Sequence, residues 1–147
     1  MTKIVYNGSF GGGGLSDKAI KRYAELRGIQ LYQVTSESEE NLDPQSLLSL
    51  GIIDNSYYLL CPPSAYDAMV EANDPNAPNM FFSEYDILAN RSDPILVQVI
   101  EELGSEANGW HADLKIKELA KGTKYVIHEY DGCETVMTPD DYDWKIA

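Results

Sequence analysis

The most regular hydrophobic pattern lies in the C-terminal third of the chain. Between residues 96 and 103 four apolar residues recur at helical spacing, after Asp93 and Pro94, which are typical of a helix N-cap and first helical position. Gly104 follows as a stop. Residues 112–117 then alternate between apolar and polar, as a strand with one wet face does. This part of the sequence predicts a helix with one core-facing stripe, followed by strands.

Two further strands are predicted near the C-terminus. The β-prone runs 125–130 and 133–137 flank an Asp-Gly dipeptide, which is a strong signal for a two-residue hairpin. The register of such a hairpin places His128 opposite Thr135 and on the same face as Cys133. A Cys–His nucleophile pair is conceivable there. The sequence offers neither a third orienting group nor an oxyanion hole, so we assign the pair no catalytic role.

The N-terminal pattern is a short strand, a glycine run and a helix. Residues 3–7 are β-branched and aromatic, and residues 8–14 contain too much glycine for regular structure. Ser16 is a good N-cap for an amphipathic helix that Gly28 ends. Residues 29–34 look like a second strand.

The middle of the chain has shorter and less regular elements. The predicted elements there are a polar loop at 35–41, a short helix from Asp43 to Leu50, a strand at 57–60, a helix capped by Ser64 and running to Val70, a loop at 73–79, and an apolar stretch at 80–82 that is too short to assign. The sequence therefore predicts an α+β fold in one small domain, 1–147. Its N-terminal part is strand–glycine loop–helix, and its C-terminal part is a helix with an antiparallel β-meander.

Charge is spread unevenly over the 147 residues. The formal net charge is −13, of which residues 1–34 contribute +3, residues 35–100 contribute −10 and residues 101–147 contribute −6. Nucleic acid and anionic membranes repel such a chain, and a basic protein surface attracts it. The alternative is that this charge only keeps the protein soluble, as it does in many proteins.

Composition excludes several other classes. Two cysteines in a chain with a core of its own do not make a disulfide scaffold, so we expect reduced thiols and an intracellular setting. The two histidines and two cysteines have no zinc-site spacing, and we expect neither a metal nor a cofactor. No apolar run approaches a membrane span, and the first residues do not resemble a secretory leader.

Several motifs resemble a family of uncharacterised phage and large-virus proteins. They are the segment Arg91-Ser92-Asp93-Pro94-Ile95-Leu96-Val97-Gln98-Val99-Ile100-Glu101-Glu102-Leu103-Gly104, then Ala107-Asn108-Gly109, Ala112-Asp113-Leu114-Lys115-Ile116 and Glu129-Tyr130-Asp131-Gly132, and the N-terminal loop Gly11-Gly12-Gly13-Gly14-Leu15-Ser16. In this loop Gly13 stands where the family usually has an aromatic residue.

The resemblance covers roughly 1–34 and 80–147, so the acidic segment 35–79 looks like an insertion. It implies viral origin and a place in the cytoplasm of an infected cell or in the virion. It implies no reaction.

The glycine run is the first candidate site. Gly11, Gly12, Gly13, Gly14 and Ser16 lie between a strand and a helix, where backbone N–H groups can bind phosphate. Neither the dinucleotide fingerprint nor the P-loop fits, because the third glycine of the first and the lysine of the second are missing. The alternative interpretation is a structural turn that needs positive φ or close backbone approach.

Acidic residues form the second candidate site. Glu37, Glu39 and Glu40 in the middle segment, with Glu101 and Glu102 at a helix end, are the residues we assign to binding a basic partner. Acids in the last turn of a helix interact unfavourably with the helix dipole, and a basic partner would offset that cost. The alternative is a solvated helix end with nearby lysines.

These patterns favour a non-enzymatic viral accessory protein that binds a basic host or viral protein. The alternatives are a nucleotide-binding protein or small enzyme that uses the glycine loop, and a virion structural component. The tail at 140–144 mixes acidic and aromatic residues, and either docks on a partner or folds back on the sheet.

Overall fold

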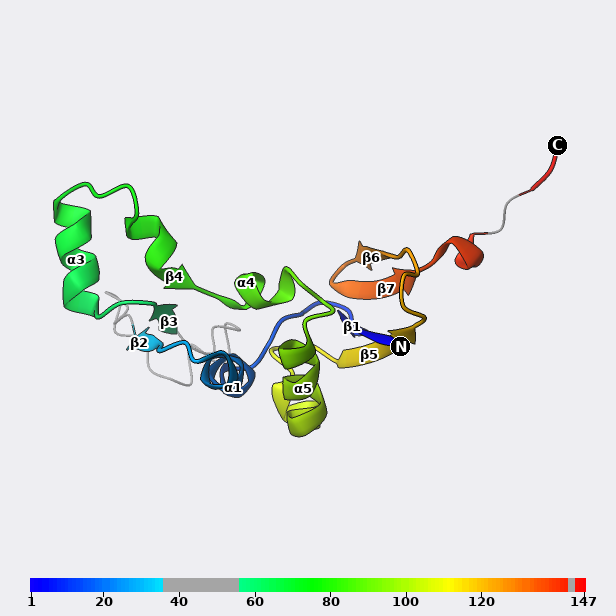
Figure 1. Cartoon of the computed structure of the whole chain (residues 1–147), viewed down its shortest axis with the longest axis horizontal. Helices are drawn as coiled ribbons and strands as arrows, with labels where there is room; N and C mark the ends of the chain where they lie inside the picture. Colours follow the sequence, from blue (N-terminus) through cyan, green and yellow to red (C-terminus); the bar gives the residue numbers. More distant parts are fainter. Residues whose placement is uncertain (36–55, 143–144) are drawn as a thin grey trace. The chain divides into compact units, whose positions relative to one another are not determined.

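Helices alternate with antiparallel strands along the chain, which confirms the predicted α+β class. The computed structural model describes residues 1–35, 56–142 and 145–147 (Figure 1). The described elements are β1 (Thr2–Asn7), α1 (Asp17–Arg27), β2 (Tyr32–Thr35), β3 (Ser56–Leu59), α3 (Pro63–Glu71), η1 (Ala77–Met80), β4 (Phe81–Phe82), α4 (Glu84–Leu88), α5 (Pro94–Leu103), η2 (Gly104–Ala107), β5 (Leu114–Leu119), β6 (Val126–Tyr130), β7 (Cys133–Met137) and η3 (Pro139–Asp141).

The chain divides into two units. We call Met1–Gly28 with Glu84–Ala147 the terminal unit, and Ile29–Ser83 the middle unit. The middle unit nearly coincides with the segment 35–79 that the sequence marks as insertion-like. The assignment of a single domain stays a prediction beside this division.

Strand β1 is the centre of the terminal unit, because it is covered on both faces. Ile4 and Val5 point to opposite faces of the strand, and both are fully buried. Ile4 packs with Leu119 and Val136, which belong to β5 and β7. β5 is the antiparallel partner of β1, and α5 also contacts β1. The first strand of the sequence therefore lies between a helix layer and a hairpin.

Helices α1 and α5 begin and end at the predicted residues. The Ser16 hydroxyl accepts a hydrogen bond from the Ala19 N–H, and the Asp93 carboxylate accepts one from the Ile95 N–H. Gly28 ends α1 in the left-handed region, with φ of 71°. Each cap satisfies N–H groups that the first turn leaves free.

Asp93 also joins the two helices. Its Oδ2 accepts hydrogen bonds from the Tyr23 hydroxyl at 2.6 Å and from the Arg27 guanidinium. Burial by itself raises the pKa of Asp93, but the hydrogen bonds from Arg27, Tyr23 and the Ile95 N–H outweigh it, so the pKa lies below its usual value.

The C-terminal hairpin has the predicted register. His128 lies opposite Thr135, and the Asp-Gly turn has positive φ at both residues, 50° and 85°, as a type I′ turn requires. The expected three-stranded meander does not form, because β5 pairs with β1 instead of β6. The reason is topological: β1 needs an antiparallel neighbour, and β5 is the strand that covers it along its whole length.

The middle unit contains the sheet β2-β3-β4 and helix α3. Ser64 does not cap α3, because the helix already begins at Pro63 and Pro62 occupies the cap position. The unassigned stretch at 80–82 supplies β4, which pairs with β3. The short helix predicted from Asp43 lies outside the described residues. None of the helices described in either unit combines the length and apolarity that crossing a bilayer requires.

Candidate functional site

The buried side-chain amide of Asn7 contributes many of the hydrogen bonds that hold the glycine loop in place. Asn7, which is 3% exposed at the end of β1, donates through Nδ2 to the carbonyl oxygens of Ser9, Gly12 and Gly132, at 3.1, 3.0 and 2.8 Å. Its Oδ1 accepts from the Asp113 N–H at 2.8 Å and from the Ser9 N–H at 3.3 Å. Asn7 thus links the glycine loop to the hairpin turn and to the start of β5.

Three glycines of the loop, Gly11, Gly12 and Gly14, are needed for conformation or space. Gly11 and Gly14 have φ of 74° and 90°, which favours glycine. A Cβ on Gly12 would lie 2.3 Å from the Trp110 carbonyl oxygen, and one on Gly14 would lie 2.2 Å from Glu84 Oε2. Positive φ and close approach are what the structural interpretation of the glycine run requires.

The backbone donors of the loop largely have protein acceptors. Gly8, Gly11 and Gly13 donate to the carbonyl oxygens of Asp113, Asp131 and Trp110, at 2.8, 2.7 and 3.3 Å. At the approach to α1, the Leu15 N–H donates to Glu84 Oε2 at 3.0 Å, and the Ser16 N–H donates to the Ala107 carbonyl oxygen at 2.9 Å. A carboxylate therefore already occupies the position next to the helix start where a phosphate would bind.

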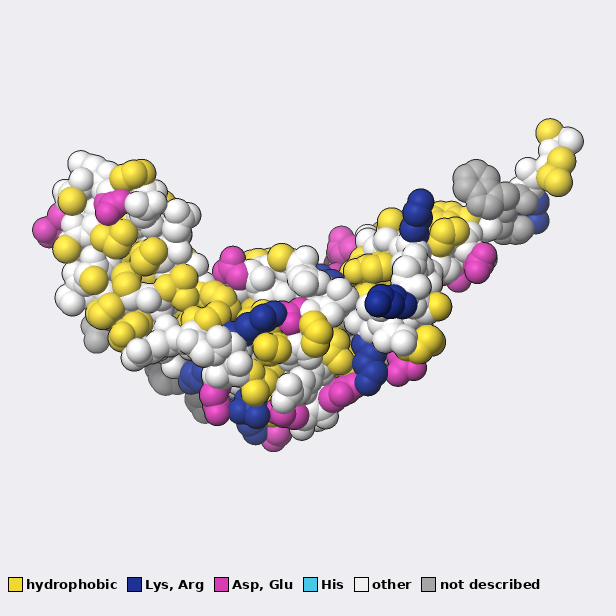
Figure 2. Space-filling model, in the orientation of Figure 1, with side chains coloured by type: hydrophobic (Ala, Val, Ile, Leu, Met, Phe, Trp, Pro, Cys, Tyr) yellow, Lys and Arg dark blue, Asp and Glu magenta, His cyan; other side chains and the backbone are white. Residues whose placement is uncertain are grey.

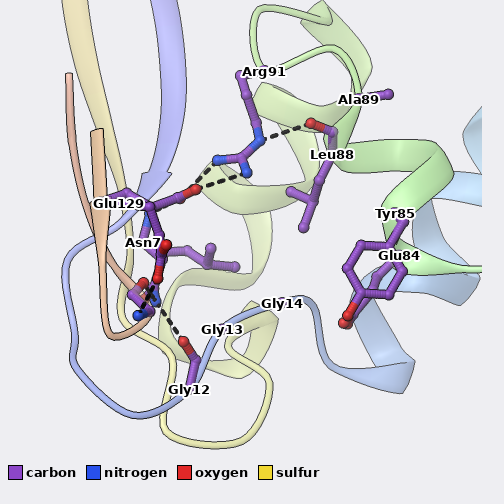
Figure 3. Close-up of a pocket in the computed structure, with 13 residues that line it drawn as sticks. Asn7, Gly12, Gly13, Gly14, Glu84, Tyr85, Leu88, Ala89, Arg91 and Glu129 are labelled. Carbon is purple, nitrogen blue, oxygen red and sulfur yellow. Dashed lines mark hydrogen bonds and ion pairs between the residues drawn. The ribbon is translucent and has the colours of Figure 1, made fainter. Parts of the chain in front are cut away.

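A cavity of about 460 Å³ opens beside the loop (Figure 3). Its charged lining residues are Glu84, Glu129, Glu134 and Arg91. Figure 3 shows the Arg91 guanidinium directed at a carboxylate, with Glu84 and Tyr85 across the cavity. Arg91 is paired with Glu134, so Glu84 and Glu129 have no cation among these four lining residues. The lining is therefore acidic and disfavours an anionic ligand.

The Arg91–Glu134 ion pair lies in the lining of this cavity and is mostly enclosed, with 20% and 13% of the two side chains accessible. The guanidinium Nη1 and Nη2 donate to the two carboxylate oxygens at 2.7 and 2.8 Å. Burial raises the pKa of Glu134, but the Arg91 donors and the Asn7 N–H hold it below its usual value. Both side chains are thus committed to the fold.

Glu101 and Glu102, which the sequence assigns to a partner, have partners within the terminal unit. Glu101 pairs with Lys3, and Glu102 accepts from Arg22 Nε at 2.9 Å. Both carboxylates remain partly exposed, with 47% and 36% of the side-chain surface accessible. These ion pairs offset the unfavourable interaction of the two carboxylates with the helix dipole, which agrees with the interpretation as a solvated helix end. The cations are Lys3 and Arg22 and not the lysines of β5.

The remaining sequence candidates are distributed as follows. Glu37, Glu39 and Glu40 lie outside the described residues. His128 Nε2 lies 3.1 Å from the Tyr142 hydroxyl, and Cys133 is a free thiol, as is Cys61. In the part of the chain that the structure describes, His, Cys, Asp and Glu side chains form no group of three or more that could hold a metal ion.

The middle unit differs from the rest of the chain in charge. Its 55 residues, 29–83, contain eight acids and no lysine, arginine or histidine. The acids are Glu37, Glu39, Glu40, Asp43, Asp54, Asp67, Glu71 and Asp74. Residues 29–83 hold no cation that would neutralise these eight acids, so the formal net charge of the unit is −8.

The same unit exposes apolar side chains. Helix α3 is largely apolar, yet none of its residues is buried among the described residues. Tyr57 and Phe81 are 37% and 43% exposed, and Leu60 and Val70 are 39% and 49% exposed. On the face drawn in Figure 2, hydrophobic side chains gather over the middle unit together with a few acidic ones. Exposed apolar area beside acidic groups is typical of a protein-binding surface.

No protein-family model, curated protein or solved structure matches this chain.

Several residues of these sites carried no sequence signal that we recognised. Asn7 at a strand end reads as an ordinary turn residue, and the Arg91–Glu134 contact joins positions 43 apart. The absence of basic residues over a whole unit was detectable as a charge imbalance, but its boundaries needed the fold.

Proposed function

We propose that this protein acts by binding a basic protein surface and that the middle unit carries the binding site. The observation that supports this most is that the unit has eight acids and no basic residue, while its described part exposes apolar side chains. Charge complementarity gives speed of association and selectivity, and buried apolar area gives affinity.

The glycine loop supports a nucleotide-binding function less well. Its N–H groups donate to protein carbonyls and to Glu84, and the neighbouring cavity is lined by carboxylates. The motif resemblance supports a viral origin for the protein, so we propose that it is an accessory protein of a phage or large virus. Its place of action would then be the cytoplasm of an infected cell or the virion.

The experiment uses the immobilised 147-residue chain to capture proteins at ~50 mM salt and at high salt. The two conditions are compared because salt screens contacts between exposed charges. The immobilised protein is exposed to a cell lysate freed of nucleic acid, and bound proteins are quantified by mass spectrometry. We expect a set enriched in basic proteins that is released as the salt concentration rises.

A pair of matched variants makes this test specific to the middle unit. Asp67→Asn/Glu71→Gln removes two exposed charges from α3, and Glu118→Gln/Asp140→Asn removes two exposed charges from the terminal unit. We expect the first variant to lose the captured set and the second to keep most of it. Equal losses in both variants, or no capture by the wild type at ~50 mM salt, would contradict the proposal.

A further inference from the structure

Three aromatic rings of the middle unit lie together, in a unit whose only charged residues are acids. We infer that this aromatic cluster, which we define as Tyr57, Tyr66 and Phe81, makes the surface selective for arginine side chains of a basic protein segment over lysine side chains. The inference rests on the proposed function, because it adds a chemical preference to the binding of a basic partner.

The cluster is built on the sheet face that carries α3. Phe81 lies opposite Leu59 in the pairing of β4 with β3, and Tyr57 is two residues before Leu59, so both rings are on the same face. The Tyr57 and Phe81 ring centroids are 5.7 Å apart with a tilt of 51°. Tyr66 of α3 meets Phe81 edge to face at 5.1 Å. Neither contact is a parallel stack, and Tyr57 and Phe81 keep more than a third of their surface accessible.

Two exposed carboxylates lie on the same helix as Tyr66. Asp67 follows Tyr66 directly on α3, and Glu71 is one helical turn further along the same face as Asp67. Both side chains are exposed. The sequence from 29 to 83 has no cation that would compete for either the rings or the carboxylates.

This combination suits the guanidinium group better than the ammonium group. A guanidinium is planar, weakly hydrated and able to stack on an aromatic ring while its N–H groups bind a carboxylate in a fork. A lysine ammonium is a compact, strongly hydrated charge, and it gains mainly from the carboxylates. Stacking of a cation on an exposed ring contributes modestly, so a preference of about three- to tenfold is expected from the accessible rings.

The probes are the peptides deca-arginine and deca-lysine, which have equal charge and length. Each is titrated calorimetrically into the whole 147-residue chain at ~50 mM salt, where charge attraction is least screened. We expect both peptides to bind and deca-arginine to bind about three- to tenfold more tightly. Binding of neither peptide would overturn the proposed function. Equal binding of both would overturn only the arginine preference.

Variants separate stacking from the stronger pairing of arginine with carboxylates. In Tyr57→Leu/Phe81→Leu we expect the affinity for deca-arginine to fall toward that for deca-lysine, which itself stays unchanged. Tyr130→Leu, at a ring of the terminal unit that is 78% exposed, is the control and keeps the wild-type ratio. An unchanged ratio in the double variant would refute the role of the rings.

A measurement on the wild type covers the case in which the double variant fails to fold. Ring-proton chemical shifts of Phe81 are followed by NMR during both titrations. We expect larger shifts with deca-arginine than with deca-lysine at equal saturation. Identical shifts with both peptides would overturn the inference without any substitution.

Discussion

At the scale of single residues, the glycine loop is held by side-chain and backbone contacts that replace regular structure. The Asn7 amide supplies five hydrogen bonds to backbone groups of three separate loops, and Gly132 brings one of these loops into contact with the Gly12 backbone. Buried backbone groups need such partners wherever no sheet or helix provides them. Glycines at the contacts make this arrangement possible, because a Cβ would separate the backbones.

A comparison of Gly132 with Gly122 distinguishes two reasons for a glycine, which are a positive φ and a lack of space for a Cβ. Their φ angles are 85° and 86°, but a Cβ on Gly132 would lie 2.4 Å from the Gly12 carbonyl oxygen, whereas one on Gly122 would meet nothing within 4 Å. We expect Gly122→Ala to cost about 1–2 kcal/mol for the left-handed conformation. Gly132→Ala should cost about 1–3 kcal/mol more, because two backbones must move apart.

Urea unfolding of both variants, followed by circular dichroism, measures the difference. Equal free energies of unfolding for the two variants would mean that the loop and the hairpin turn are not in the close contact described above. A much larger loss in Gly122→Ala than in Gly132→Ala would contradict the packing role altogether.

At the scale of elements, Arg91 and Glu134 cover the edge of β1 that β5 leaves open. The Val5 N–H donates to the Arg91 carbonyl oxygen at 2.9 Å, and the Asn7 N–H donates to Glu134 Oε1 at 2.8 Å. An uncovered strand edge invites pairing with other chains. An ion pair from the segment before α5 and from β7 therefore protects the edge and ties the hairpin to β1.

This arrangement predicts a loss of stability in acid. The folded-state pKa values of Glu134 and Asp93 are lowered, so both groups stabilise the fold above their unfolded pKa values of about 4.3 and 3.9. That contribution is lost as the pH falls through the lower folded-state values. We expect the thermal midpoint to be flat above about pH 5 and to fall steeply below about pH 4.

Glu134→Gln tests how much of the loss of stability in acid comes from the contact at the edge of β1. We expect it to cost about 1–3 kcal/mol at pH 7, because Arg91 loses its anionic partner. The gap to the wild type should narrow as the pH falls below about 4, because the wild-type carboxyl then becomes protonated. Glu118→Gln, at an exposed carboxyl of β5, is the control and should change the free energy of unfolding at pH 7 by less than about 0.5 kcal/mol. A constant gap between Glu134→Gln and the wild type would refute the linkage.

The elements that the sequence predicted correctly are those with local signals. Ser16 and Asp93 cap helices through bonds within three residues of themselves, and the Asp-Gly turn sets its hairpin without outside help. Pairing of β1 with β5 could not be predicted in this way, because the competing neighbour β6 is closer in sequence and no local property of β5 excludes it. The role of Asn7 was missed for the same reason. Gly132 and Asp113 are 125 and 106 residues away from it in sequence, and Gly12 lies on the other side of the glycine loop.

At the scale of the whole molecule, the two units have different sources of stability. The terminal unit buries β1 on both faces and packs two capped helices against each other. In the described part of the middle unit, only Tyr58, Leu59 and Ala77 are buried hydrophobic residues, and α3 buries none. Burial of apolar area is the main favourable term in folding, so the two units should differ in local stability.

Hydrogen exchange measured by mass spectrometry tests this difference and connects it to binding. We expect peptides from α3 and β3 to exchange faster than peptides from β1, β5 and α5, because opening them exposes little buried apolar area. Equal protection in both units would instead mean that they open together as one cooperative structure. Addition of deca-arginine should slow exchange in α3 and leave α5 unchanged, since a ligand stabilises the region that it contacts. Protection that rises in α5 and not in α3 would place the basic partner on the terminal unit, next to Glu101 and Glu102, and would refute the assignment to the middle unit.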